Sequence, residues 1–178
     1  MPRSDTKARA RREDTSTTSV DPAERAREIA LRILTHSPKS CAQLRSRLVE
    51  KGVEPALADS LIARYVEVGL LDDAALAAQI ARTRHNERGL APRAIRLELQ
   101  RKGFEPADIE AALEPIDDAI DDRARELARK KWDSLGHLDP AVKVRRVVGM
   151  LARRGYSPSS AFSVVKDWQR ADKAGDDY

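Results

Sequence analysis

The sequence predicts an all-α protein of three tandem three-helix repeats that form an elongated, curved helical array. The main observation is a phrase that occurs three times in altered form, as LVEKGVEP at 48–55, LQRKGFEP at 99–106 and LARRGYSP at 151–158. Its glycines lie 51 and then 52 positions apart, and such regular self-similarity is typical of repeat proteins. No segment shows sustained alternation of apolar and polar residues, so we expect no β-sheet.

Each copy of the phrase predicts a helix, a stop and a second helix. A leucine closes the apolar face of the first helix, and a Lys or Arg next to the glycine suits the negative end of the helix dipole. The glycine supplies the left-handed conformation that ends the helix. The proline loses no hydrogen bond at the first position of the next helix, because that amide has no acceptor within the helix.

The chain divides into five predicted segments. Residues 1–20 mix Arg, Ser, Thr and Asp with almost no large apolar side chain, which predicts a disordered basic tail. The three repeats follow at 21–71, 72–116 and 117–170, and a frayed tail is predicted at 171–178. Because none of these short helices is stable alone, each is expected to bury its apolar stripe against its own repeat and the neighbouring one. A complete row of repeats with polar ends favours a monomer.

In the first repeat, the sequence DPAE at 21–24 combines an N-cap, a helix-starting proline and an acidic first turn, and the helix it begins ends before Pro38. Ser40 and Gln43 form a capping box for the second helix, and Pro55 begins the third. The residues predicted to face inward are Ala26, Ile29, Ala30, Ile33 and Leu34, then Cys41, Leu44 and Leu48, then Leu57, Leu61, Ile62, Tyr65 and Val66.

In the second repeat, the sequence GLLDD at 69–73 predicts a turn and an Asp N-cap for the fourth helix, which reaches Gly89. The fifth helix begins near Pro92 and the sixth at Pro106. The residues predicted to face inward are Leu76, Ile80 and Ala81, then Ile95 and Leu99, then Ile109, Leu113 and Ile116.

In the third repeat, acidic residues are predicted in the first turns of a longer seventh helix and basic residues at its end, a polarity that complements the helix dipole. Pro140 begins the eighth helix and Pro158 the ninth. The acidic residues are Asp117, Asp118, Asp121 and Asp122, and the basic ones Arg129, Lys130 and Lys131. The residues predicted to face inward are Val144, Val147, Val148 and Leu151, then Phe162, Val165 and Trp168.

The composition favours a cytoplasmic helical protein. Charged residues make up 35% and aromatic residues 4%, a balance typical of helical cores built from Leu, Ile, Val and Ala. No run of the sequence reaches the length that spans a bilayer, and the N-terminus lacks the apolar segment of a secretory signal, so we expect no membrane contact. The single Cys41 can form no internal disulfide, which fits a reducing compartment.

The sequence contains no constellation that predicts catalysis, a metal site or a cofactor. His36, His85 and His137 lie far apart without a second ligand at metal spacing, and are expected to be surface or cap residues. Cys41 is on an apolar stripe, which predicts a core thiol, and helix capping explains the pair Asp72–Asp73. Each glycine stands alone, so no phosphate-binding loop is expected. We therefore predict that the protein acts by binding and is not an enzyme.

Two strongly basic windows indicate an acidic partner. Residues 82–102 carry seven basic and two acidic residues, and residues 123–154 carry ten and three. Such patches suit a polyanion or an acidic protein surface. The alternative is that either window is the solvated face of ordinary helices.

Several motifs together resemble the RecX family: GLLDD at 69–73, AxxIxRxR at 77–84, IxxELxxKGF at 95–104, and LxxxLxxKGV at 44–53. The resemblance covers residues 25–168. Leu76-Ala77 stand where the family has an aromatic residue followed by Ala. Because leucine still fills a core position, the fold is expected to hold, whereas a contact made by that ring is not carried over.

The resemblance implies nine helices and a negative regulator of the recombinase RecA, with a role in DNA repair, recombination and the SOS response. RecX-like proteins bind the RecA filament on DNA and inhibit its ATPase, strand exchange and coprotease activities. They block filament growth or promote disassembly, and many bind DNA weakly. Direct contact with single- or double-stranded DNA is left open.

The exposed cations of the two basic windows are the candidate contacts with the RecA filament or DNA. The alternative is that several of them pair with Glu87, Glu98 or Glu126. The candidates are Arg82, Arg84, Arg88, Arg93, Arg96, Arg101, Lys102, Arg129, Lys130, Lys131, Lys143, Arg145, Arg146, Arg153 and Arg154.

Two other function classes remain. One is a stand-alone helical DNA-binding protein of helix-turn-helix type, since short helices joined through glycine also build that motif. Against it, residues 106–116 contain no Lys or Arg and residues 55–68 contain only Arg64. The other is a scaffold for acidic proteins that has no dependence on a recombinase.

Overall fold

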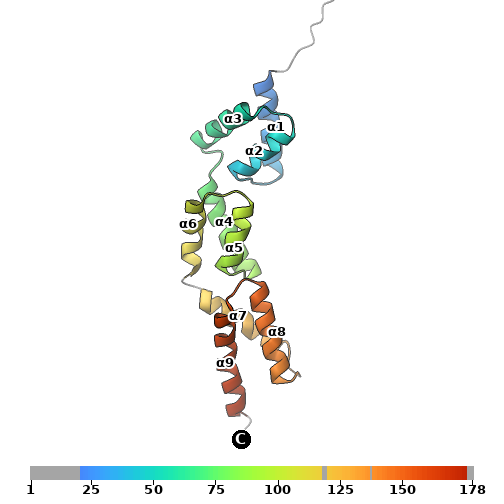
Figure 1. The fold of residues 1–178 in the computed structure, drawn as a ribbon, viewed down its shortest axis with the longest axis vertical. Helices are drawn as coiled ribbons and strands as arrows, with labels where there is room; N and C mark the ends of the chain where they lie inside the picture. Colours follow the sequence, from blue (N-terminus) through green and yellow to red (C-terminus); the bar gives the residue numbers. More distant parts are fainter. Residues whose placement is uncertain (1–20, 118–119, 137, 176–178) are drawn as a thin grey trace, which may run out of the picture.

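The computed structural model describes residues 21–117, 120–136 and 138–175, and these residues form nine α-helices and no strand. Repeat 1 contains α1 (Pro22–His36), α2 (Cys41–Glu50) and α3 (Pro55–Glu67). Repeat 2 contains α4 (Asp73–Arg88), α5 (Pro92–Arg101) and α6 (Pro106–Asp117). Repeat 3 contains α7 (Ile120–Asp133), α8 (Pro140–Arg153) and α9 (Pro158–Gly175). Figure 1 shows the three triplets following one another along the long axis of the molecule, which confirms the all-α class and the row of three-helix repeats.

The helices begin and end where the repeated phrase predicts. Gly52, Gly103 and Gly155 have φ angles of +82°, +77° and +91°, so each adopts the left-handed conformation that ends the helix before it. At α2, the Gln43 amide donates to the Ser40 hydroxyl at 3.2 Å, which confirms the capping box. The basic tail predicted at residues 1–20 lies outside the described residues.

Each repeat has its own apolar core. Equivalent positions of α2, α5 and α8 hold the pairs Leu44 and Leu48, Ile95 and Leu99, and Val147 and Leu151, all of them fully buried. These pairs belong to three separate clusters of buried residues, and the helices pack mainly against partners within their own repeat. The expectation that apolar stripes are also buried against the neighbouring repeat is therefore largely wrong.

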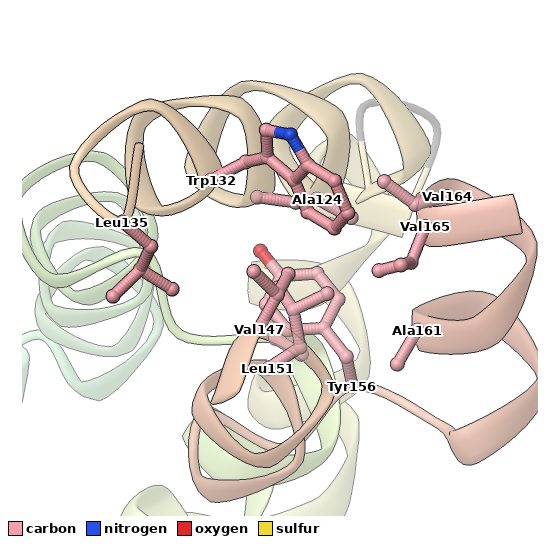
Figure 2. Packing of buried hydrophobic residues seen from close by; sticks show 11 residues of the cluster. Ala124, Trp132, Leu135, Val147, Leu151, Tyr156, Ala161, Val164 and Val165 are labelled. Carbon is pink, nitrogen blue, oxygen red and sulfur yellow. The ribbon is translucent and has the colours of Figure 1, made fainter. Parts of the chain in front are cut away.

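The core of repeat 3 is built around an aromatic side chain. In Figure 2, Trp132 of α7 lies beside Val164 and Val165 of α9, and Val147 of α8 faces it. The indole of Trp168 meets that of Trp132 edge-on, with the ring centroids 6.1 Å apart. Trp132 is buried and Trp168 partly buried, so both rings serve packing.

Two residues predicted to face inward are exposed. Val66 and Phe162 have 49% and 57% of their surface accessible. The repeat register explains both: Phe162 lies 52 positions after the exposed Glu110, and Val66 lies 51 positions before the exposed Asp117. An apolar side chain at a surface position of the repeat stays at the surface, whatever its hydrophobicity.

Three further predictions need correction. Asp117 is the last residue of α6 and does not begin α7, because α6 continues through it; Asp118 lies outside the described residues. The helix α9 extends to Gly175, so residues 171–175 continue the helix and are not a frayed tail. His85 is buried in the last turn of α4, where its Nδ1 lies 3.1 Å from the Leu90 carbonyl oxygen, and is not a surface residue.

Neighbouring repeats meet through the ends of their second helices. At junction 1–2, the Ser40 hydroxyl before α2 donates to the Lys102 carbonyl after α5 at 2.5 Å. At junction 2–3, the Ala91 amide before α5 donates to the Arg154 carbonyl after α8 at 2.9 Å. At both junctions, the start of the second helix of one repeat contacts the end of the second helix of the following repeat.

Within the described residues, no helix combines the length and the apolar composition that a bilayer crossing requires.

Candidate functional site

Four of the predicted contact residues are held in close ion pairs, and a fifth, Lys102, is held in a longer one. Such a cation is partly neutralised and is less available to a partner. Glu98, one of the acidic partners expected from the sequence, also lies 3.9 Å from the Lys102 ammonium. The pairs are Arg84 with Glu98, Arg96 with Glu110, Arg129 with Asp133, and Lys130 with Glu126.

Arg84 and Glu98 form the best-shielded of these pairs. The guanidinium donates two hydrogen bonds of 2.8 Å to the two carboxylate oxygens, which joins α4 to α5. Both side chains are about three-quarters buried, with 22% and 24% exposed. The hydrogen bonds from Arg84 hold the pKa of Glu98 below its ordinary value of 4.5. This geometry ties α4 to α5 and leaves Arg84 less available to a partner than the exposed arginines.

The pair Arg96–Glu110 joins α5 to α6 and recurs in repeat 1. Arg45 of α2 and Asp59 of α3 stand 51 positions earlier and form two hydrogen bonds of 2.6 and 3.1 Å. The pKa of Asp59 is lowered by the hydrogen bonds from Arg45. Because the same pair links the second and third helices twice, Arg96 also has a role inside its repeat.

The other predicted cations have no ion-pair partner among the described residues. Two of them still have a local contact: the Lys143 ammonium lies 5.2 Å from the centroid of the Trp132 ring, and Arg101 Nε donates to the Leu97 carbonyl at 3.1 Å. Lys131 is half-buried. The remaining members of this group are Arg82, Arg88, Arg93, Arg145, Arg146, Arg153 and Arg154, and among them only Arg154 is half-buried.

Junction 2–3 brings two distant basic segments together. Arg88 ends α4 and Arg93 lies in the first turn of α5, while Arg153 and Arg154 end α8. The hydrogen bond between Ala91 and the Arg154 carbonyl fixes the end of α8 between the two segments of repeat 2. We call Arg88, Arg93, Arg153 and Arg154 the junction cluster. Four guanidinium groups, none paired with a carboxylate in the part of the chain that the structure describes, give this junction a preference for an anionic partner.

Junction 1–2 has a basic groove of about 370 Å³ between α2 and the end of α5. Four cations line it against one carboxylate, Glu50. Sequence analysis identified two of the cations, Arg101 and Lys102, and missed the other two, Lys39 and Arg47. Charge counting could not find these two, because acidic residues elsewhere in repeat 1 nearly cancel its positive charge.

The acidic and thiol residues considered for chemistry serve the fold. Asp72 accepts the Ala75 amide at 2.8 Å and caps α4, whereas Asp73 accepts the Cys41 amide at 3.0 Å and caps α2 across the junction. Burial, followed by the charge and hydrogen bond of Asp73, raises the pKa of the Cys41 thiol to about 11. Cys41 is therefore protonated at neutral pH and a poor nucleophile. No three His, Cys, Asp or Glu side chains of the described ranges converge as metal ligands.

Comparison with protein families covers each repeat. Family models described as the first, second and third three-helix domains of RecX match residues 26–64, 72–113 and 118–165.

Relatives named "Regulatory protein RecX" match most of the chain. The Streptomyces coelicolor protein is 39% identical over 158 residues, which cover 88% of this chain and 83% of that protein. The Thermobifida fusca protein is 36% identical over 86% of this chain and 84% of its own length. The Mycolicibacterium smegmatis protein is 40% identical over 80% of this chain and 78% of its own length.

Solved structures have the same fold. The crystal structure of RecX from Lactobacillus salivarius superposes with a TM-score of 0.73 at 20% identity, covering 83% of this chain and 96% of that chain. A crystal structure of a regulatory protein RecX gives a TM-score of 0.66 at 23% identity, covering 82% of this chain and 73% of that chain. At these identities the likeness is one of fold.

Proposed function

Because the chain belongs to the RecX family of regulatory proteins, we propose that it is a negative regulator of RecA that binds the RecA–DNA filament. Its action is to inhibit the ATPase, strand exchange and coprotease activities of the filament, by blocking filament growth or promoting disassembly. The observation that carries the proposal beyond the family is the junction cluster. An elongated row of repeats that gathers unpaired arginines at a junction suits a long anionic partner.

The chemistry of arginine supports this partner. A guanidinium presents several N–H donors in a rigid fork and binds carboxylates and phosphates through two parallel hydrogen bonds. A nucleoprotein filament offers both groups, carboxylates on the protein and phosphates on the DNA. The same four side chains can therefore serve either surface, and the proposal does not require DNA contact.

The test is the ATPase of the cognate RecA in the presence of single-stranded DNA, titrated with this protein below the concentration of RecA. We expect inhibition at a small fraction of the RecA concentration, because capping or disrupting a filament affects many subunits at once. Absence of inhibition at equimolar protein and low salt would reject the proposal.

The junction cluster is tested with the double variant R88E/R93E. Both side chains are exposed and have no ion pair among the described residues, so the change reverses charge without breaking a structural contact. We expect inhibition to weaken at least tenfold while thermal stability is retained. The double variant R27E/R64E makes the same change in net charge at two exposed arginines of repeat 1, breaks only their local ion pairs with Glu24 and Glu67, and should inhibit like the wild type.

The alternative function, a stand-alone helical DNA-binding protein, gives a different result in the same assay. Such a protein would bind labelled DNA in the absence of RecA and would inhibit the ATPase only by covering the DNA, at a stoichiometry set by DNA length. The exposed arginines favour contact with phosphates in general. However, α6 contains no Lys or Arg and α3 contains only Arg64, so the third helices of repeats 1 and 2 lack the cations of a helix that reads a DNA groove.

A further inference from the structure

A second basic concavity lies in repeat 1, between α1 and α2. It has a volume of about 950 Å³, within the range of ligand and peptide sites. One face of α1 forms a wall, with Arg25, Ile29, Ile33 and His36 at helical spacing along it. The other wall is the end of α2, which includes Lys51. We call this concavity the repeat-1 groove.

The floor of the repeat-1 groove is apolar. Ile29 and Ile33 are one helical turn apart and pack against the core of repeat 1, yet both are only half-buried and line the groove. An apolar surface left in contact with water favours a partner that covers it with apolar side chains. A phosphate backbone offers no such side chains.

The rim of the groove is basic, and its acidic residues are already paired. Its two carboxylates, Glu28 and Glu50, bind Arg32 at 2.7 Å and Arg47 at 2.9 Å.

Three further cations of the rim, Arg25, Lys39 and Lys51, have no ion-pair partner among the described residues. The groove therefore has an excess of positive charge around an apolar strip, and its complement is an acidic segment with apolar side chains.

The equivalent place in repeat 2 is bridged by an ion pair. Arg84 and Glu98 stand 51 positions after Ile33 and Arg47, and their two hydrogen bonds of 2.8 Å join α4 to α5. An isoleucine and an arginine cannot form that bridge. Both partners of the bridge therefore differ in repeat 1, and no ion pair crosses the space between α1 and α2 at this position, where Arg47 pairs with Glu50 of its own helix.

We propose that the repeat-1 groove binds an acidic amphipathic segment of a partner protein, with its apolar side chains on Ile29 and Ile33 and its carboxylates on Arg25 and Lys51. The chain's own ends do not supply this segment. The helix α9 lies at the end of the molecule opposite to repeat 1 in Figure 1, and the composition of residues 1–20, five basic and three acidic residues, does not complement a basic groove. The inference goes beyond the proposed function, because the groove shares no residue with the junction cluster.

The first test is selection of random 12-residue peptides on the immobilised full chain. We expect the enriched peptides to combine Asp or Glu with Leu, Ile or Phe. An enriched peptide added to the chain should shift the methyl NMR signals of Ile29 and Ile33 and leave that of the fully buried Ile95 unchanged. Failure to enrich any peptide, or enrichment of peptides without carboxylates, would overturn the proposal.

The second test uses the double variant R25E/K51E, whose side chains are exposed and whose folding is not expected to change. Fluorescence anisotropy should show at least tenfold weaker binding of the enriched peptide, with R88E/R93E, which also reverses two exposed cations without an ion pair among the described residues, as the matched control. Unchanged affinity in R25E/K51E would overturn the proposal. So would a single-stranded oligonucleotide that shifts the Ile29 and Ile33 signals when the peptide does not.

The two proposals fail separately. The variant R88E/R93E should lose ATPase inhibition and keep peptide affinity, whereas R25E/K51E should lose peptide affinity. A peptide that binds R88E/R93E tenfold more weakly than the wild type would place its site on the junction cluster and overturn the groove assignment.

Discussion

At junction 1–2 the start of α2 meets the end of α5, and at junction 2–3 the start of α5 meets the end of α8. The first contact is made by side chains: the Ser40 hydroxyl donates to the Lys102 carbonyl, and the Asp73 carboxylate accepts from the Cys41 amide. At the equivalent position of the second junction, the Ala91 amide donates to the Arg154 carbonyl and Ala91 belongs to the core cluster of repeat 3. The side-chain bond of this junction comes from α7, where the Arg123 guanidinium donates to the Asn86 carbonyl.

This difference shows that one backbone arrangement tolerates two kinds of chemistry. Both junctions place a glycine against an alanine, because a Cβ on Gly103 would lie 2.6 Å from the Ala42 Cβ and one on Gly155 would lie 2.7 Å from the Ala94 Cβ. The close approach is common to both, while the polar or apolar contact beside it differs. Gly52 has no such neighbour within 4 Å, since no repeat precedes repeat 1 in the described chain.

The largest expected effect comes from G155A, which fills the space that junction 2–3 uses. Its Cβ would also lie 3.0 Å from the Ala94 amide nitrogen, and φ is +91°. Overpacking and the left-handed conformation together should destabilise the protein by about 2–4 kcal/mol in urea denaturation. The control G52A has only the conformational cost, about 1 kcal/mol. Equal losses in the two variants would show that the close contact is unimportant.

The variant S40A tests the polar junction. Ser40 is fully buried, and its removal takes away the cap on the Gln43 amide and leaves the Lys102 carbonyl without its partner. We expect a loss of about 2–3 kcal/mol in unfolding free energy. The control S157A removes a cap on the Ser160 amide outside any junction and should cost about 1 kcal/mol. A loss no greater than in the control would contradict the junction role.

The variant E98Q tests the bridge that repeat 2 has and repeat 1 lacks. Because Arg84 lowers the pKa of Glu98, the pair stabilises the fold above the ordinary pKa of 4.5, and this contribution is lost as pH falls through the folded-state pKa. At pH 7 we expect a loss of about 1 kcal/mol, after allowance for solvent screening. The difference in thermal unfolding between wild type and E98Q should shrink as the pH falls below 4.5. The control is D59N, which breaks the ion pair between Arg45 and Asp59. Because this pair is more exposed than Arg84–Glu98, D59N should change stability less than E98Q does.

The smallest expected effect concerns the reactivity of Cys41, which reports on junction 1–2. With a pKa of about 11 instead of 9.0, its thiolate fraction at pH 8 is about 100-fold lower than that of an unperturbed thiol, so alkylation by iodoacetamide should be slow. Removal of the Asp73 charge in D73N should accelerate alkylation by about two- to fivefold. A rate for the wild-type chain equal to that of a free thiol would contradict the burial of this junction.

The repeated phrase predicted the helix boundaries well because the signals are local. Capping by Ser40, the left-handed glycines and the prolines at first helical positions act within a few residues of the chain. The fully buried positions also followed from helical periodicity, as Ile95 and Leu99 illustrate. Periodicity failed for Phe162, since a hydrophobic residue on a helix does not reveal whether its face meets another helix or water.

The candidate site was less predictable from the sequence than the helix boundaries were, because counts of charged residues do not show which cations are paired. Arg84 and Arg96 pair with carboxylates 14 residues away on the next helix, a distance beyond any local rule. Lys39 and Arg47 were missed because repeat 1 contains nearly equal numbers of basic and acidic residues. Only the positions of the side chains in the folded chain show which cations of repeat 1 are paired.

The sequence by itself determined the class of fold, the number of repeats and the helix ends, because these depend on local conformational preferences and on a period of 51 to 52 residues. Only the tertiary structure decided that the three cores are separate, which arginines are paired, and that Arg93 shares a junction with Arg153. The physical reason is that ion pairing and burial depend on distances between helices. These distances are set by core packing within each repeat and by the two glycine contacts between repeats.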